Sequence, residues 1–123
     1  MFKFPDINGF GAPFTSIHPY KQKQIKHLID NITPDIDYVI IFGSAVQHSC
    51  WIGSDIDVCL VGVGEYYPTR HLRQVGQAYD FLFYPDIDTL RKLAENEYLS
   101  IEKEIWEKGV LVYDKSCKLV KTS

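Results

Sequence analysis

The chain has 123 residues, of which 46% are apolar and 14% aromatic, and this composition excludes a disordered, collagen-like or coiled-coil protein. Its length matches one domain, since domains usually run to about 100–200 residues. The 13 Lys and Arg residues against 16 Asp and Glu residues give a formal net charge of -3, which disfavours general nucleic-acid binding because such proteins carry a basic excess.

The chain shows no sign of membrane insertion or secretion. No apolar run reaches the roughly 20 residues that a membrane-spanning helix needs, and the first residues lack the apolar stretch of a secretory signal. The three cysteines share no CxxC or Cys/His metal-ligand spacing. We therefore expect a cytoplasmic protein with reduced thiols and no membrane partner.

An irregular N-terminal arm is predicted for residues 1–17, which are rich in Phe but interrupted by Pro and Gly, and a single domain is predicted for residues 18–123. The first helix of that domain should run from Pro19 to Ile32, where apolar residues recur at helical spacing, and Pro34 should end it. Three lysines of this helix are predicted to form a solvated face rather than a phosphate-binding clamp: Lys21, Lys23 and Lys26.

Three strands are predicted next. The β-branched run Tyr38–Phe42 is typical of a strand that is buried on both faces. A loop with one or two helical turns follows from Gly43 to Ser54. The segment Asp55–Val61 then alternates between an apolar face and a face that carries Asp55 and Asp57. After a turn-rich loop and a short helix beginning near Thr69, the third strand should span Gln77–Tyr84.

Two helices and a last strand complete the predicted domain. The first helix begins after Pro85 with Asp86 or Asp88 as its cap, and the second carries Ile101 and Ile105 and ends at Gly109. Residues 110–113 form the last strand. This order predicts a small α/β (or α+β) domain in which helices pack on a mixed sheet.

The pattern that carries chemistry is Gly43-Ser44, then ten residues, then Asp55-Ile56-Asp57. Two carboxylates at i and i+2 of a strand lie on one face, where their like charges repel unless a cation lies between them. Such oxygen ligands suit Mg²⁺, which often binds one or two carboxylates together with substrate phosphates. A glycine allows close approach of a ligand to the backbone, and amides at a strand-to-helix turn bind anions. Together these residues predict a site for a nucleoside triphosphate.

The Asp-Ile-Asp string alone is weak evidence, because the chain contains it three times. Asp35-Ile36-Asp37 precedes a strand and is predicted to form a turn. Asp86-Ile87-Asp88 opens a helix, where acidic side chains favour the positive end of the helix dipole. Asp55 and Asp57 are the pair that lies inside a strand pattern and follows a Gly-Ser loop.

Gly43-Ser44, the ten-residue spacing and Asp55-x-Asp57 together resemble the signature of the polymerase-β-type nucleotidyltransferase superfamily. The resemblance covers roughly residues 38–113, and the length is similar to that of the minimal, single-domain members. It implies the polymerase-β-type fold. Small prokaryotic members are often encoded beside a HEPN-domain partner, and several act as antitoxins that transfer AMP from ATP onto that partner. The resemblance therefore implies ATP and a HEPN-type protein as partners.

The resemblance also implies a third carboxylate on an adjacent strand, and Asp80 matches that position. By this resemblance Asp55 and Asp57 hold two Mg²⁺ ions, or Mn²⁺, and Asp80 completes one metal shell and accepts the proton of the attacking hydroxyl. Gly43 and Ser44 hold the departing pyrophosphate. Two alternatives stay open: Asp80 is an acid at a sheet edge that faces water, or Glu65 in the following loop is the third carboxylate.

The sequence departs from the family pattern in one respect. Many members carry an arginine shortly after the Gly-Ser pair, whereas residues 45–54 contain no Lys or Arg. The role of that arginine in binding the triphosphate would pass to Arg70, Arg73 or an arginine of a partner protein, or the activity would be weak. Two functions follow: a Mg²⁺-dependent transfer of AMP onto a hydroxyl of a protein or small molecule, or an inactive antitoxin-like module that neutralises a HEPN toxin. An antibiotic-modifying transferase is disfavoured, since such enzymes usually carry an added helical domain.

Overall fold

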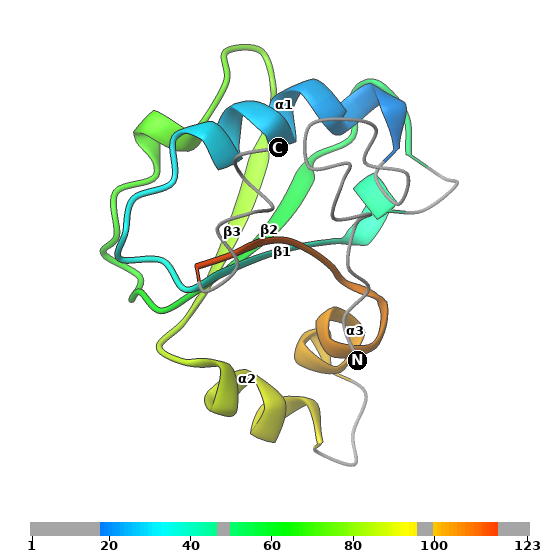
Figure 1. The fold of residues 1–123 in the computed structure, drawn as a ribbon. Coiled ribbons are helices and arrows are strands. Elements are labelled where there is room, and N and C mark those ends of the chain that lie inside the picture. Colours follow the sequence, from blue (N-terminus) through cyan, green and yellow to red (C-terminus); the bar gives the residue numbers. More distant parts are fainter. Residues whose placement is uncertain (1–17, 47–49, 96–99, 116–123) are drawn as a thin grey trace.

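The computed structural model describes residues 18–46, 50–95 and 100–115. Within these ranges three α-helices pack on a four-stranded mixed sheet, so the predicted small α/β fold is confirmed (Figure 1). The elements are α1 (Pro19–Asp30), β1 (Tyr38–Phe42), β2 (Ile56–Val61), β3 (Tyr79–Tyr84), α2 (Ile87–Ala94), α3 (Ile101–Lys108) and β4 (Val110–Asp114), with short 3₁₀ turns η2 (Gly43–Val46) and η3 (Arg70–Leu72). The predicted N-terminal arm lies outside the described residues, and the division into arm and domain stays a prediction.

The strand order in the sheet is β3-β2-β1-β4. β1 lies between two antiparallel neighbours, β2 and β4, whereas β2 and β3 run parallel. The end of β1 therefore lies beside the starts of β2 and β3. The register pairs Phe42 with Asp57 across β1 and β2, and Asp57 with Asp80 across β2 and β3.

Each face of the sheet has its own helical layer (Figure 1). On one face, the apolar side of α1 packs on alternate strand residues such as Ile41 and Val58. On the other face, Leu90 of α2 and Ile105 of α3 pack on residues such as Cys59. Because strand side chains alternate between faces, Asp57 and Asp80 project from the face that α2 and α3 cover.

Side-chain caps fix the starts of the two helices on that face. Asp86, one of the two predicted caps, accepts a hydrogen bond of 2.7 Å from the Thr89 amide. Ser100 accepts one of 3.1 Å from the Lys103 amide. None of the helices in the described segments is long and apolar enough to cross a membrane.

Two local predictions are wrong. The short helix before β3 is only the 3₁₀ turn η3, and Thr69 makes no side-chain capping bond there. Lys21 does not belong to a solvated face, because its side chain is fully buried, whereas Lys23 and Lys26 are exposed as predicted. Tertiary acceptors distant in the sequence draw the Lys21 ammonium inward, and helical periodicity does not report them.

Candidate functional site

The bend after β1 is shaped around one carboxylate. Gly43 has φ of +71°, a left-handed conformation that favours glycine. A Cβ atom placed on Gly43 would overlap Oδ2 of Asp57 and would lie 3.1 Å from its Cγ. Glycine is thus needed twice here, for the backbone conformation and for the space that the carboxylate of Asp57 occupies.

Ser44 connects the bend to the second predicted carboxylate. Continuing the antiparallel register beyond Phe42 and Asp57 places Ser44 opposite Asp55. The Ser44 hydroxyl donates a long hydrogen bond of 3.4 Å to the carbonyl oxygen of Asp55. Such a long bond is weak, so the hydroxyl can turn to another acceptor at little cost. The structure therefore brings the Gly-Ser pair and Asp55-x-Asp57 side by side.

Asp80 lies on the strand next to Asp57. The two residues are register partners on parallel strands, which are about 4.8 Å apart, and both project from the same face. β3 is an edge strand and Asp80 is exposed, so this side chain faces water and also adjoins Asp57. Glu65, the alternative third carboxylate, follows the far end of β2 and lies at the opposite end of that strand from Asp57.

The negative charges of neighbouring carboxylates affect the ionisation of Asp57. The pKa of Asp57 is raised to about 6, first by burial and then by the negative charges of Asp80, Asp55 and Glu104. Like charges that destabilise the ionised form of a carboxyl mark a place where a cation would be bound favourably.

Glu104 is a residue of this cluster that the sequence does not identify. It belongs to α3 and immediately precedes Ile105, which is buried against the sheet. Because Glu104 is next to Ile105, the sequence places it at the edge of the apolar face of α3. No sequence pattern indicates which part of the sheet this edge covers.

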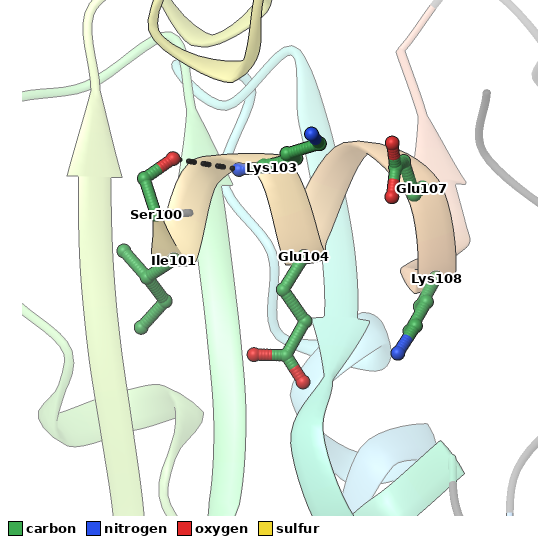
Figure 2. A pocket seen from close by; sticks show the side chains of 6 residues that line it. All are labelled: Ser100, Ile101, Lys103, Glu104, Glu107 and Lys108. Atoms are coloured by element: carbon green, nitrogen blue, oxygen red, sulfur yellow. Dashed lines mark hydrogen bonds between the residues drawn. The ribbon is translucent and has the colours of Figure 1, made fainter. Parts of the chain in front are cut away.

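Glu104 and Lys108 extend from α3 toward the end of the sheet where β1 stops and β2 and β3 begin (Figure 2). They are four residues apart and so share one helix face. They line a cavity of about 480 Å³ together with Ser100, Ile101, Lys103 and Glu107. The register of β4 on β1 pairs Val110 with Ile41, one residue before the end of β1, so α3 ends close to the end of β1.

The arginines proposed to replace the missing loop cation lie elsewhere. The guanidinium carbon of Arg73 is 4.9 Å from the ring centre of Phe81 and 6.0 Å from that of Tyr79. Those two rings pack on the α1 side of the sheet, so Arg73 is held on the face opposite Asp57 and Asp80. Arg70 begins η3, and η3 contacts α1 on that same side.

The donors at this strand end fit a divalent cation in chemistry but form no complete cage. In the described part of the chain, no group of three or more His, Cys, Asp and Glu side chains is gathered so that it could hold a metal ion. Asp57 and Asp80 nevertheless offer adjacent hard oxygen donors, and Mg²⁺ usually takes one or two carboxylates with substrate phosphates and waters. The set of three aspartate ligands stays a prediction.

A known protein family matches most of the chain. The family model described as "Polymerase beta, Nucleotidyltransferase" matches residues 23–118, a span that includes all five predicted site residues. No curated protein matches the chain. Members of the matched family typically depend on a divalent metal, and their general activity is nucleotidyl transfer. The chain therefore belongs to the polymerase-β-type nucleotidyltransferase family.

Proposed function

We propose that the protein transfers a nucleoside monophosphate, AMP from ATP, onto a hydroxyl group with the help of Mg²⁺. The observation that carries the proposal is the packing of the Asp57 carboxylate over Gly43, with Asp80 as its register partner. This arrangement brings the bend at Gly43, which we propose binds phosphate, and two carboxylates to one strand end. Both halves are needed for phosphoryl transfer, in which catalysis is mostly positioning and charge neutralisation.

Asp80 is suited to receive the proton of the acceptor. Its carboxylate is exposed at the sheet edge, where an incoming hydroxyl can reach it. The hydroxyl oxygen forms a bond to the α-phosphorus, its proton passes to Asp80, and the bond from the α-phosphorus to the bridging oxygen breaks. Pyrophosphate leaves with that oxygen.

Ser44 and Lys108 are suited to hold the phosphates that leave. The Ser44 hydroxyl makes a long bond of 3.4 Å to Asp55 and is therefore available as a donor. Lys108 extends toward this strand end and supplies the positive charge that the loop after Ser44 lacks (Figure 2). A lysine binds phosphate as a point charge, as lysines do in other triphosphate sites.

Asp57 and Asp80 would hold the divalent cation, with Asp55 beside them. The chemistry that such a cation supplies is charge neutralisation on the phosphates and on carboxylates that otherwise repel one another. The raised pKa of Asp57 supports this assignment, because the repulsion from Asp80 and Asp55 falls when a cation binds.

The acceptor belongs to another molecule in this proposal. The exposed carboxylate of Asp80 lies on an edge strand, so an acceptor approaching from outside can meet it without any movement of the sheet. A hydroxyl on a HEPN-type protein is the acceptor that we propose, and a small-molecule hydroxyl would meet the same geometry.

The test is transfer from labelled ATP, UTP, CTP or GTP to a co-expressed HEPN-type protein, with Mg²⁺ or Mn²⁺. We expect label from ATP on the acceptor, and a loss of about 10²–10⁴-fold in Asp80→Asn, since that is the usual contribution of a positioned base. Asp35→Asn is the matched control, because Asp35 is an exposed aspartate of the first Asp-Ile-Asp string. A wild-type chain that binds the partner but transfers none of the four nucleotides would instead indicate an inactive, antitoxin-like module.

A further inference from the structure

Lys21 is a buried ammonium that the proposed reaction does not use. Among the residues that the structure describes, it is the only charged side chain that is fully buried. Its Nζ donates to the carbonyl oxygen of Ile52 at 3.1 Å, to Oε1 of Gln77 at 2.8 Å and to the carbonyl oxygen of Ser54. An ammonium has three donors, and all three are satisfied here by uncharged acceptors.

Those acceptors lie just before the first residues of β2 and β3, the two strands that carry the carboxylates. Ser54 lies three residues before Asp57, and Gln77 lies three residues before Asp80. From α1, the side chain of Lys21 contacts the segments before both strands at once. The ammonium therefore joins the segments that lead into β2 and β3, although it belongs to neither.

Gln77 completes the link between the strands. Its Nε2 donates to the carbonyl oxygen of Ser54 at 2.9 Å and to that of Ala78 at 2.7 Å. The Ala78 carbonyl in turn accepts from the Ile56 amide at 3.0 Å, in the first bond between the two strands. Ser54 and Gln77 are thus held to one another both directly and through Lys21.

The position of β3 is the weak point of the site, because an edge strand pairs on one side only. A slip of one residue along β2 would turn Asp80 to the opposite face of the sheet, since side chains alternate. The bonds of Lys21 and Gln77 resist that slip at the end where Asp57 and Asp80 lie.

We propose that Lys21 is a positioning residue, which ties Ser54 to Gln77 and so keeps Asp57 and Asp80 in register for the reaction. This inference rests on the proposed function for its catalytic part and on the hydrogen-bond network for its structural part. A desolvated ammonium costs folding free energy unless its bonds are made, so a purely space-filling role would be served better by an apolar side chain. Arginine would not replace it, because a planar guanidinium does not match three converging acceptors.

The test compares Lys21→Met, which keeps about the length of the apolar stem but removes the ammonium and its donors, with Lys23→Met, which removes an exposed lysine of the same helix. Relative to wild type, we expect amide hydrogen exchange in Lys21→Met to become faster in β3, with little change in β1 and β4. We also expect kcat to fall by about 10–100-fold, as for other residues that orient reacting groups, with KM for the nucleotide within about threefold of wild type. Lys23→Met should behave as wild type in both measurements.

Gln77→Ala is the second variant, for the case that Lys21→Met does not fold. It removes the link to β3 and leaves the bonds of Lys21 to Ile52 and Ser54 in place. It should show the same selective exchange in β3 with a smaller fall in kcat. Uniform loss of protection across the sheet, or an unchanged kcat in folded protein, would overturn the positioning role. If wild type itself transfers nothing, the proposed function fails, while the exchange of β3 amides still decides whether Lys21 holds the register.

Discussion

Replacing Gly43 by alanine tests whether the bend after β1 is built around Asp57. Three glycines of this chain separate the two effects that the substitution combines. Gly64 has open space where a Cβ would lie and no left-handed conformation, whereas Gly76 has open space there and φ of +86°. Gly43 has φ of +71° and a Cβ position that overlaps the carboxylate of Asp57. A change to alanine therefore introduces neither effect at Gly64, the strained backbone alone at Gly76, and both the strained backbone and the overlap with Asp57 at Gly43.

The expected loss of stability can be worked out in steps. Gly64→Ala should be neutral or slightly stabilising, since it only restricts the unfolded chain. Gly76→Ala should lower the free energy of unfolding by about 1–2 kcal/mol, the cost of a side chain in a left-handed conformation. Gly43→Ala should cost that amount and about 0.5–1.5 kcal/mol more, because the new methyl group forces the flexible end of Asp57 out of its rotamer.

Activity separates the variants more strongly than stability does. Displacement of a carboxylate by about 1 Å costs roughly 100-fold in rate, so Gly43→Ala should lose transfer by that factor while Gly76→Ala keeps it. Urea unfolding followed by tryptophan fluorescence gives the stabilities, and label transfer gives the rates. Equal activity of the Gly43 and Gly76 variants would refute the claim that glycine is needed to seat Asp57.

Three more predictions concern charge and capping. The pKa of Asp57 is raised to about 6 from 3.8, so the stability that its protonated form contributes is present below about pH 4 and lost as the pH rises to about 6. The shift corresponds to about 3 kcal/mol, which solvent screening reduces to about 1–2 kcal/mol. In urea titrations at pH 7.5, the free energy of unfolding of Asp57→Asn should therefore exceed that of metal-free wild type by about 1–2 kcal/mol. At pH 4 the two proteins should not differ. Lys108→Met should raise KM for the triphosphate about 3–10-fold with little change in kcat, most clearly at low salt, whereas Lys103→Met, whose side chain does not extend toward the strand end, should not (Figure 2). Ser100→Ala removes the cap of α3 and should lower stability by about 1 kcal/mol in thermal unfolding, and a neutral result would show that α3 is held by packing alone.

The elements were predictable from the sequence because their signals are local. The apolar run Tyr38–Phe42 matches β1 as observed, and the proline and cap positions place α1 and α2 within a few residues. The Gly-Ser pair and Asp55-x-Asp57 were predictable as neighbours, since two consecutive strands carry them.

Contacts across the sheet were not predictable in the same way. Lys21 is buried because its acceptors lie 31 to 56 residues further along the chain, and no local pattern encodes them. The stacking of Arg73 on Phe81 and the approach of Glu104 to Asp57 likewise depend on which face each element covers. The roles of the site residues are still predictions, whereas their proximity to one another is a property of the fold.

The parallel pairing of β2 and β3 has a consequence for how this small domain can change. A tight hairpin between these strands would have placed the end of β3, near Tyr84, beside Asp57; the longer connection through residues 62–78 returns the chain so that both strands start together. Insertions in the exposed part of that connection, residues 64–66, should leave the carboxylates in place, because the strand ladder and the bonds of Gln77 set their alignment. Residues 64–66 can thus acquire new recognition surfaces while the reacting groups stay fixed.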